Sequence, residues 1–306
     1  MNIGKQIAYV FPGQGSQKLG MFSELSAQYP IIIDTFSQAS AILGYDLWQL
    51  TQAGPEEKLN LTENTQPAML AADVAAWRVC CSSKCEQPSY LAGHSLGEYS
   101  ALVCAGAIDF ADAIELVAKR GSLMQSAVPA GDGAMAAIIG LDNKSVNAVC
   151  NEASENAIVA PANYNSVGQT VIAGERAAVE RAAVLAKQAG ALKVMILPVS
   201  VPAHCNLMQA VAKQLADLLA GIEIVAPKIP VIHNVDVMPH KDPSSIRAML
   251  VQQLYSPVRW VETIEFFAGM HIDEMIECGP GRVLAGLNKR ITKEVPTINF
   301  SVKLSD

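Results

Sequence analysis

The stretch from Tyr90 to Tyr99, which reads YLAGHSLGEY, constrains the fold more than any other part of the chain. It begins as a short apolar run with strand character and continues into a helical pattern, with Gly93, Ser95 and Gly97 between the two. The spacing G-x-S-x-G is typical of a nucleophile elbow, a tight strand-to-helix turn that lifts a serine hydroxyl clear of its neighbours. Glycine suits both flanking positions because a side chain there would collide with the strand or the helix.

The five-residue pattern also fits a glycine- and serine-rich turn without chemistry. The strand before it and the helix after it favour the elbow, in which Ser95 is a candidate nucleophile. Backbone N–H groups at the start of the following helix could stabilise an oxyanion. The rest of the chain must then supply a base, a second oxyanion donor and a group that recognises the substrate.

The composition narrows the class of protein. A chain of 306 residues forms one large domain or two, and a globule of this size buries about 75% of its unfolded surface. A hydrophobic fraction of 51% with 17% charged residues fits a well-packed soluble α/β protein. The net charge of −7, without a run of Lys or Arg, argues against a nucleic-acid-binding protein but leaves a local basic patch open.

Two further features indicate a cytoplasmic protein. No apolar run approaches the ~18 residues of a membrane span, and the residues from Met1 to Lys5 lead into a strand and lack the apolar region of a signal peptide. The seven cysteines are scattered, and Cys81 and Cys85 have a metal-like separation without a second pair or a nearby histidine. We therefore expect free thiols in a reducing compartment, no metal site and no contact with a membrane.

The N-terminal segment is a candidate for the second oxyanion donor. Ile7–Phe11 has the length and apolarity of a strand, and the sequence PGQGSQ from Pro12 to Gln17 ends it sharply. The glycines on both sides of Gln14 free the backbone to turn its N–H groups toward a ligand. On local grounds an ordinary β-turn is the favoured alternative. Helices are expected near 21–41 and 66–80, the second with Pro67 in its first turn.

Arg120 is a candidate for substrate recognition. Asp109 is the expected N-cap of a helix whose apolar face includes Phe110, Ala113 and Val117, and Arg120 lies at the edge of that face. A charge in this position must extend to solvent, pair with another group or meet an anionic ligand. An arginine is well suited to a carboxylate, which it binds through two parallel hydrogen bonds.

The sequence from 131 to 199 predicts a separate unit. Strands are expected at 134–139, 157–160, 170–173 and 192–197, helices at 142–150 and 175–188, and a loop from Asn163 to Gly168. The order β-α-β-β-α-β is that of a ferredoxin-like fold. We expect a small ferredoxin-like subdomain at 131–199, inserted into a large α/β catalytic subdomain formed by 1–130 and 200–306.

His204 is the preferred candidate for the base. It follows the segment Val201-Pro202-Ala203 and precedes a helical pattern, so the positive end of a helix dipole should keep its imidazole neutral. A capping or surface histidine is the alternative. The other four histidines are weaker candidates, namely His94, His233, His240 and His271. Of these, His233 follows a predicted strand and could reach the site.

The last third of the chain returns to α/β alternation. We expect a helix from about Ser244 to the segment Gln253–Tyr255, a strand at Glu274–Cys278, a helix from Val283 and a closing strand at Ile298–Val302.

A serine in an elbow with a downstream histidine suggests acyl transfer or hydrolysis through an acyl-enzyme. In an α/β-hydrolase an acidic residue would lie between the two in chain order. Four aspartates fall there, but none follows a core strand at the usual place. The histidine is therefore expected to be oriented by something other than a carboxylate.

Seven segments together carry a resemblance to a known family. In chain order they are Pro12-Gly13-Gln14-Gly15-Ser16-Gln17, Thr65-Gln66-Pro67-Ala68, Gly93-His94-Ser95-Leu96-Gly97-Glu98-Tyr99, Arg120, Val201-Pro202-Ala203-His204, Asn234-Val235-Asp236 and Gln253-Leu254-Tyr255-Ser256-Pro257-Val258. Over essentially its whole length the chain resembles the malonyl-CoA:acyl carrier protein transacylases of bacterial fatty-acid synthesis. The resemblance implies a hydrolase-like α/β core with a parallel sheet, interrupted by the ferredoxin-like subdomain.

The resemblance also implies roles for individual residues. Ser95 is implied as the nucleophile that takes malonyl from coenzyme A, and His204 as its base. The implied oxyanion donors are the backbone N–H groups of Gln14 and Leu96. The remaining implied roles are histidine orientation by Gln253, through its backbone carbonyl, and by Asn234, carboxylate binding by Arg120, and substrate contacts by His94, Gln66, Asn163 and Asn165.

The same resemblance implies a ping-pong reaction without a metal or cofactor. Its substrate is malonyl-CoA, its partner is acyl carrier protein, whose phosphopantetheine thiol receives the malonyl group, and the chain is expected to act as a monomer. Carrier proteins of this kind are acidic, so docking needs a basic patch. The candidates are Arg282, Lys289, Arg290 and Lys293, with a solvated helix face as the alternative.

Three points stay open from the sequence. His233 precedes Asn234 where the resemblance predicts another asparagine. A hydrolase or editing acyltransferase that uses the same serine is an alternative function, as is a non-catalytic module that binds carrier protein. The sequence alone does not decide between fatty-acid and polyketide synthesis.

Overall fold

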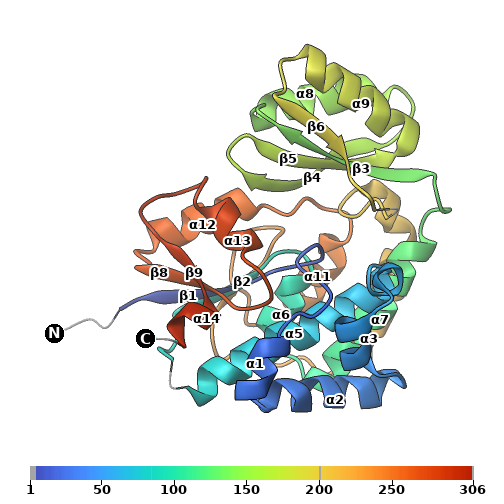
Figure 1. The fold of residues 1–306 in the computed structure, drawn as a ribbon. Helices are drawn as coiled ribbons and strands as arrows, with labels where there is room; N and C mark the ends of the chain where they lie inside the picture. Colours follow the sequence, from blue (N-terminus) through green and yellow to red (C-terminus); the bar gives the residue numbers. More distant parts are fainter. Residues whose placement is uncertain (1–4, 84, 200, 305–306) are drawn as a thin grey trace.

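The computed structural model describes residues 5–83, 85–199 and 201–304, and its two sheets lie in two separate parts of the molecule (Figure 1). The larger part is built on a five-stranded sheet in the order β7-β2-β1-β8-β9, in which every neighbouring pair is parallel. Its strands are β1 (Ile7–Phe11), β2 (Tyr90–Gly93), β7 (Val231–Ile232), β8 (Glu274–Glu277) and β9 (Thr297–Asn299). The predicted parallel α/β core is confirmed. The predicted lead-in at Met1 falls on residues 1–4, outside the described residues.

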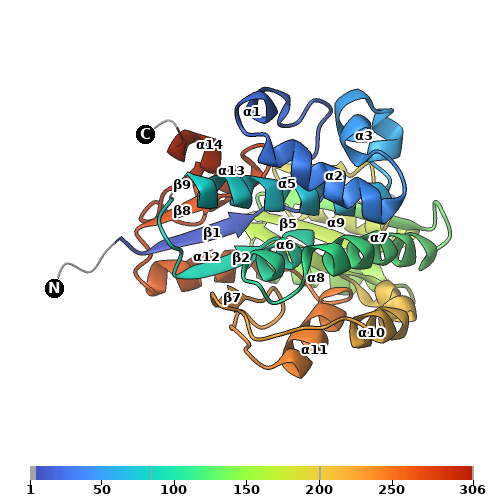
Figure 2. The same cartoon turned by 90° about the horizontal axis from the view of Figure 1, so that it is seen from below.

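The central strand β1 is buried on both faces, as a parallel sheet covered by helices requires. Successive side chains of a strand point to opposite faces, so its five apolar residues serve two cores. Ile7, Tyr9 and Phe11 belong to one core, and Ala8 and Val10 belong to the other. Figure 2 shows helices above and below the sheet in this part of the molecule.

The helices of the larger part surround this sheet. They are α1 (Ser23–Gln28), α2 (Ile31–Leu43), α3 (Leu47–Ala53), α4 (Glu56–Leu59), α5 (Thr62–Ser82), α6 (Leu96–Cys104), α7 (Phe110–Ser126), the 3₁₀ helix η1 (Asn206–Val211), α10 (Ala212–Ala220), α11 (Pro243–Gln253), α12 (Trp260–Gly269), α13 (Val283–Asn288) and α14 (Phe300–Lys303). In the part of the chain that the structure describes, no helix combines the length and apolarity needed to span a membrane.

Helix α5 corrects one prediction. It begins at Thr62 rather than near residue 66, so Pro67 lies inside the helix and not in its first turn. Tertiary packing explains the earlier start, because Gly121 of α7 lies directly against the first turn of α5. A Cβ atom at Gly121 would come within 2.6 Å of the Cα of Glu63. The packed first turn is formed even though Pro67 has no N–H to donate to the preceding turn.

Two further boundaries differ from the prediction. The single helix expected near 21–41 is divided into α1 and α2 at Tyr29-Pro30, where the proline begins a new helix. The closing strand ends at Asn299, and α14 begins at Phe300, which is buried. In both places the local pattern identified an element but not its end.

The second sheet has four strands in the order β4-β5-β3-β6, all antiparallel to their neighbours. Its elements follow the predicted order β-α-β-β-α-β and are β3 (Gly133–Ile139), α8 (Asn143–Ser154), β4 (Val159–Ser166), β5 (Gln169–Glu175), α9 (Arg176–Gln188) and β6 (Lys193–Ile196). Figure 1 shows α8 and α9 together on one face of this sheet. The predicted small antiparallel subdomain is confirmed.

The loop predicted from Asn163 to Gly168 is wrong for most of its length. Residues up to Ser166 belong to β4 and pair with β5, with two register shifts that interrupt the regular alternation. The turn itself consists of Val167 and Gly168, and Gly168 has a positive φ of 71° that favours glycine. Asn163 and Asn165 therefore belong to a strand and not to a loop.

The two parts are joined at β4. The backbone N–H of Tyr164 donates to the carbonyl of Val258, and the N–H of Val258 donates to the carbonyl of Ala162, both at 2.9 Å. Val258 belongs to the larger part and lies just before α12. This short pairing holds the edge of the small sheet against the larger part beside the elbow.

Candidate active site

The elbow has the geometry that the sequence predicts. Strand β2 ends at Gly93, α6 begins at Leu96, and Ser95 between them has φ 52° and ψ −105°. This left-handed backbone conformation is strained for a residue with a side chain and is typical of functional sites. A Cβ at Gly93 would lie 1.9 Å from the Gly97 carbonyl, and one at Gly97 would lie 2.1 Å from the Phe11 carbonyl oxygen. Both glycines are therefore required by close backbone approach.

Ser95 and His204 lie within hydrogen-bonding distance. The Ser95 Oγ is 2.7 Å from His204 Nε2, and His204 Nδ1 is 2.7 Å from the backbone carbonyl oxygen of Gln253. Because a carbonyl only accepts, Nδ1 carries the proton and Nε2 is left to accept the proton of the serine hydroxyl. The Gln253 carbonyl therefore lies at the ring nitrogen through which the resemblance implies that it orients the histidine.

The backbone of His204 is fixed as firmly as its ring. Its N–H donates to the carbonyl of Leu254 at 2.9 Å, and its φ is 63°. The side chain is buried, with 3% of its surface exposed. The C-terminal end of α11 thus holds both the main chain and the imidazole of this residue.

Burial and the neighbouring Arg120 guanidinium lower the pKa of His204 to about 3. The sequence predicted a neutral imidazole, but for a different reason. His204 does not cap an α-helix: Cys205 follows it, and the next element is the short 3₁₀ helix η1. Desolvation disfavours the imidazolium here, and the positive charge of Arg120 adds to that effect.

The N-terminal turn packs directly on the elbow. A Cβ at Gly13 would lie only 2.4 Å from the carbonyl oxygen of His94. Gln14, Leu96, Ser95 and His204 all line one cavity of about 210 Å³. Leu96 is the first residue of α6, where backbone N–H groups have no acceptor within the helix. Both predicted oxyanion donors therefore belong to residues at the nucleophile.

Arg120 does not extend to solvent. It lies on α7 with 1% of its surface exposed, and its guanidinium is 5.1 Å from the centre of the Tyr99 ring. Nη1 donates to Gln66 Oε1 at 2.8 Å, and Nη2 donates to Gln253 Oε1 at 3.0 Å. Within the described residues no carboxylate forms an ion pair with it, and its Nε has no hydrogen-bond partner. A buried cation that donates to neutral amides and has no carboxylate partner among the described residues is suited to an anionic ligand.

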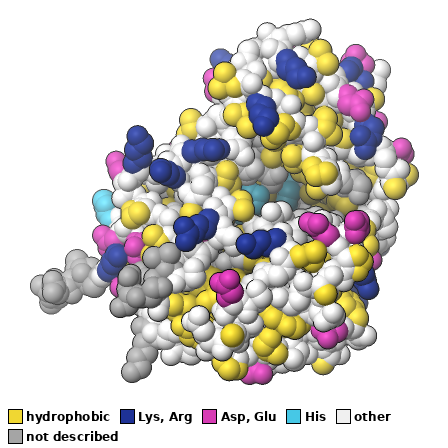
Figure 3. Space-filling model, in the orientation of Figure 1, with side chains coloured by type: hydrophobic (Ala, Val, Ile, Leu, Met, Phe, Trp, Pro, Cys, Tyr) yellow, Lys and Arg dark blue, Asp and Glu magenta, His cyan; other side chains and the backbone are white. Residues whose placement is uncertain are grey.

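The cavity brings together nine of the eleven predicted site residues. They are Gln14, Gln66, His94, Ser95, Leu96, Arg120, Asn163, Asn165 and His204. The remaining lining is largely apolar and includes Met124, Met135 and Leu197. Figure 3 shows a hollow between the two parts of the molecule with histidine side chains at its floor. A wider hollow of about 840 Å³ among α2, α5, α7 and α10 contains neither Ser95 nor His204.

His94 and Asn165 close one side of the cavity. His94 Nε2 lies 2.8 Å from Asn165 Oδ1, which joins the elbow to β4 of the small subdomain. Burial lowers the pKa of His94, so its ring is neutral and donates from Nε2 to the amide oxygen.

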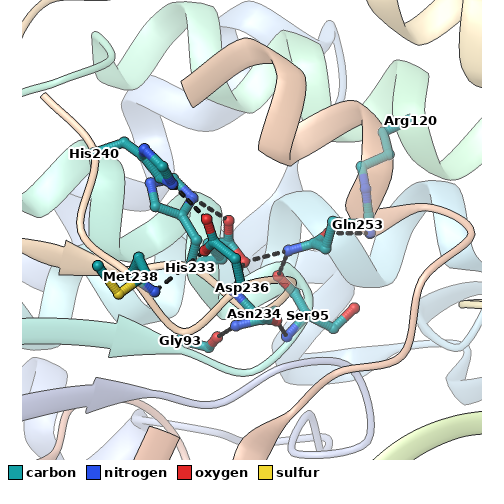
Figure 4. Close-up of polar contacts among 10 residues, drawn as sticks. Gly93, Ser95, Arg120, His233, Asn234, Asp236, Met238, His240 and Gln253 are labelled. Atoms are coloured by element: carbon teal, nitrogen blue, oxygen red, sulfur yellow. Dashed lines mark hydrogen bonds and ion pairs between the residues drawn. The ribbon is translucent and has the colours of Figure 1, made fainter. Parts of the chain in front are cut away.

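Asn234 corrects a predicted role. The hydrogen bonds of its side chain go to the elbow and not to His204: its Oδ1 accepts from the Ser95 N–H at 2.8 Å, and its Nδ2 donates to the Gly93 carbonyl at 2.7 Å (Figure 4). Its side-chain amide matches one acceptor and one donor of the elbow backbone. Asn234 therefore holds the nucleophile turn, while Gln253 alone of the two orients the histidine.

Glu98 is a site residue that the sequence reasoning missed. Its buried carboxylate accepts from the Asn234 N–H at 3.0 Å and from Gln253 Nε2 at 2.8 Å, and His233 Nδ1 lies 2.7 Å from its other oxygen. An acidic residue in the first turn of a helix is usually solvated or caps that helix. The signal available in the sequence was its position inside the elbow motif, three residues after Ser95.

Among the described residues no cluster of His, Cys, Asp and Glu has the arrangement of a metal site. The chemistry of the cavity is that of a serine, a neutral histidine, backbone N–H groups and a buried arginine. This set suits nucleophilic attack on a carbonyl whose substrate carries a negative charge.

Comparison with known proteins agrees with this geometry. Residues 8–298 match the family model of the acyl transferase domain. The malonyl CoA-acyl carrier protein transacylase of Salmonella typhimurium is 56% identical over 286 residues, which cover 94% of this chain and 93% of that protein. The malonyl CoA-acyl carrier protein transacylase of Coxiella burnetii, whose structure has been solved, is 51% identical, with a TM-score of 0.97 over 98% of this chain and 95% of that one.

A third relative was solved with a partner. It is a malonyl-transacylase in complex with its type II polyketide acyl-carrier protein, and it is 55% identical with a TM-score of 0.95 over 96% of each chain.

The low pKa of His204 predicts an unusual pH dependence. An ordinary imidazole takes up a proton below pH 6.5 and loses its ability to accept the serine proton, whereas His204 stays neutral down to about pH 3. We expect the rate at which a fluorophosphonate modifies Ser95 to change by less than ~2-fold from pH 8 to pH 5, where a histidine of ordinary pKa would have lost ~30-fold of its neutral form. The adduct is followed by intact mass, with probe hydrolysis measured separately at each pH. A fall in rate centred near pH 6.5 would contradict the expectation.

Proposed function

The chain belongs to the acyl transferase domain family and, within it, to the malonyl-CoA:acyl carrier protein transacylases, and we propose that Ser95 carries the malonyl group between the two thiols. The protein is a malonyltransferase that moves malonyl from malonyl-CoA to acyl carrier protein for fatty-acid synthesis. The observation that carries the proposal is the 2.7 Å contact between Ser95 Oγ and a buried, neutral His204. The steps below rest on the contacts around these two residues.

Acylation begins with attack of Ser95 Oγ on the thioester carbonyl. His204 Nε2 takes the hydroxyl proton as the new C–O bond forms, and the carbonyl oxygen becomes an oxyanion near the Leu96 and Gln14 N–H groups. The C–S bond then breaks, and coenzyme A leaves as a thiolate that takes the proton back from His204. Losing one oxyanion donor typically costs ~10²–10³ in rate, which gives the glycine-flanked turn at Gln14 a reason to be present.

Transfer to the carrier protein reverses these steps. The phosphopantetheine thiol gives its proton to His204 and attacks the carbonyl of the serine ester, so that a new C–S bond forms. The C–O bond to Ser95 then breaks, and Ser95 Oγ, the leaving group, takes the proton back from His204. A histidine whose pKa is lowered to about 3 binds a proton only briefly, so it hands the proton on readily. The thiolate of coenzyme A is a good leaving group and needs no strong acid.

Arg120 is proposed to bind the free carboxylate of the malonyl group. It is buried in the cavity wall, and Gln66 and Gln253 hold its guanidinium through amide oxygens. We propose direct substrate contacts for Gln66, His94, Asn163 and Asn165, because all four line the same cavity, and Gln66 also accepts from Arg120. The narrow, largely apolar cavity also limits the water that could hydrolyse the ester.

The alternatives fit these observations less well. A hydrolase for neutral acyl chains has no use for a buried arginine without a carboxylate partner. A non-catalytic carrier-binding module has no use for a serine, a neutral histidine and a strained elbow in contact with one another.

We further propose that 131–199 is the small subdomain and that 1–130 and 200–306 form the catalytic one, with the cavity between them. We place the protein in the cytoplasm, because its seven cysteines are free thiols, as is usual in a reducing compartment.

The direct test is acyl-enzyme formation. Mixing the protein with malonyl-CoA should add one malonyl group per chain by intact mass and release one equivalent of coenzyme A, because Ser95 accepts the group before any carrier protein is present. Ser95→Ala should show neither event, and added carrier protein should remove the adduct from the wild type. An adduct that persists on Ser95→Ala would overturn the assignment of the nucleophile.

Arg120→Ala should shift the substrate preference from malonyl-CoA toward acetyl-CoA. Loss of a charge-assisted pair costs roughly 1.5–3 kcal/mol, so the rate of Ser95 acylation by malonyl-CoA should fall by ~10–100-fold, while acylation by acetyl-CoA should change little. Rates with both thioesters are measured in single turnover on the same preparation. Unchanged selectivity would mean that the malonyl carboxylate is bound elsewhere.

Carrier-protein docking is proposed at a basic patch formed by residues just before and just after α13. Arg282, Lys289, Arg290 and Lys293 are all exposed, and Arg290 Nη1 donates to Gln169 Oε1 of the small subdomain at 2.8 Å. The patch therefore reaches from one part of the molecule to the other. Figure 3 shows Lys and Arg side chains beside the hollow on this face, although the whole chain has a charge of −7.

Neutralising Lys289→Gln and Arg290→Gln together should raise the KM for carrier protein by about 3–10-fold, since each exposed charge contributes up to ~1 kcal/mol. Ser95 acylation by malonyl-CoA should not change. Lys213→Gln on α10 is the matched control. An unchanged KM for carrier protein in the double variant would remove this patch from consideration.

A further inference from the structure

A line of buried polar side chains runs behind the cavity from His233 to Arg120. His233 Nδ1 lies 2.7 Å from Glu98 Oε1, Gln253 Nε2 donates to Glu98 Oε2 at 2.8 Å, and Gln253 Oε1 accepts from Arg120 Nη2 at 3.0 Å. Figure 4 shows His233 and Arg120 on opposite sides of the Ser95 turn, with Gln253 between Arg120 and that turn. Apart from Arg120 they lie outside the cavity lining, so they act on the substrate only through other residues.

The amide of Gln253 has one allowed orientation. Its Nε2 donates to two acceptors, Glu98 Oε2 and the Ser95 carbonyl, the latter at 2.9 Å. A flipped amide would place its oxygen against both of these acceptors and its N–H₂ against the Arg120 guanidinium, so that every contact would pair like with like. The carboxylate of Glu98 therefore decides that Gln253 presents an oxygen to Arg120.

Glu98 is in turn fixed by residues after β7. Its second oxygen accepts from the Asn234 N–H, and its first oxygen faces His233 Nδ1. Both side chains of the His233–Glu98 pair are fully buried, and among the described residues no Lys or Arg pairs with this carboxylate. Without His233 the buried Glu98 carboxylate would lose one of its three hydrogen-bond partners. This loss destabilises the arrangement and favours a different orientation of the Glu98 side chain.

The placement of Gln253 has an electrostatic consequence. Its neutral amide stands between the Glu98 carboxylate and the Arg120 guanidinium, so the two charges do not pair directly. His233 holds the carboxylate on the side away from Arg120. The positive charge of Arg120 is therefore not neutralised by Glu98 and is available to an anionic ligand in the cavity.

We propose that His233 is a positioning residue, which through Glu98 and Gln253 orients Arg120 toward the carboxylate of the acyl group. This inference rests on the proposed function of Arg120. It goes beyond that function because it assigns acyl selectivity to a residue that does not line the cavity.

The chemistry of position 233 supplies a matched pair of variants. The δ-amide of asparagine places an N–H₂ where the histidine ring has Nδ1, so His233→Asn keeps a donor to Glu98. His233→Leu fills similar space and removes that donor. The histidine also has an Nε2 without a hydrogen-bond partner, which the asparagine lacks, so this second nitrogen is not needed for the contact.

The test is the ratio of Ser95 acylation rates with malonyl-CoA and acetyl-CoA, followed by intact mass. His233→Leu should lower the malonyl-to-acetyl ratio by at least ~10-fold, because a lost hydrogen bond to a charge has about that effect, and the acetyl rate should stay within ~3-fold of wild type. His233→Asn should stay within ~3-fold of the wild-type ratio. In an Arg120→Ala background His233→Leu should have no further effect on the ratio, since both changes act on one group.

Several outcomes would overturn the inference. A wild-type ratio in His233→Leu would do so, as would an equal fall in both rates, which is the signature of a merely structural role. An undiminished effect in the Arg120→Ala background would exclude the route through the arginine. If the wild type itself forms no malonyl adduct on Ser95, the proposed function fails first, and the two failures are thereby distinguished.

A measurement on the unaltered protein guards against a variant that does not fold. In ¹⁵N NMR spectra of the wild type, the Nδ1 of His233 should carry a proton, because the Glu98 carboxylate accepts from it. An unprotonated Nδ1 would contradict the proposed contact without any substitution.

Discussion

The active site depends on one imidazole held between two oxygens. His204 accepts from the Ser95 hydroxyl on one side and donates to the Gln253 carbonyl on the other, at 2.7 Å each. These three residues come from the elbow, the segment before η1 and the end of α11, so the contact forms only when most of the chain is folded. A carbonyl oxygen is a weaker partner for an imidazolium than a carboxylate. The arrangement therefore fixes the tautomer without making the histidine strongly basic.

The buried charges near this imidazole are kept apart from each other. Arg120 lies close enough to lower the pKa of His204, and its guanidinium donates to the neutral amide oxygens of Gln66 and Gln253. The Glu98 carboxylate is fully buried and is occupied by His233, Asn234 and Gln253. One cation in the cavity wall and one anion behind it are thus separated by a neutral amide. An enzyme that binds a carboxylate and also needs a neutral base benefits from both effects of the same arginine.

Much of this site could be predicted from the sequence because its causes are local. The glycines at 93 and 97 reflect backbone approaches within a few residues, and Arg120 departs from the apolar periodicity of its own helix. What could not be predicted depends on tertiary contacts. Three features arise from contacts between segments more than 100 residues apart. They are the hydrogen bonds of Asn234 with the elbow, the burial of Glu98 and the desolvation of His204. The same holds for the fold: the order of strands and helices along the small subdomain could be predicted from local patterns, whereas the start of α5 was set by packing against Gly121.

The segment from Gln253 to Val258 serves both the chemistry and the architecture. Its first residue provides the acceptor for His204, and its last pairs with β4 of the small subdomain through two backbone hydrogen bonds. Only four residues separate these two attachments, which is too short a segment to act as a flexible linker. A movement of the small sheet relative to the larger one would displace this segment, and with it the carbonyl that accepts from His204. The width of the cleft and the alignment of the proton acceptor are therefore mechanically coupled. A cleft that opened too far would move His204 out of line with Ser95.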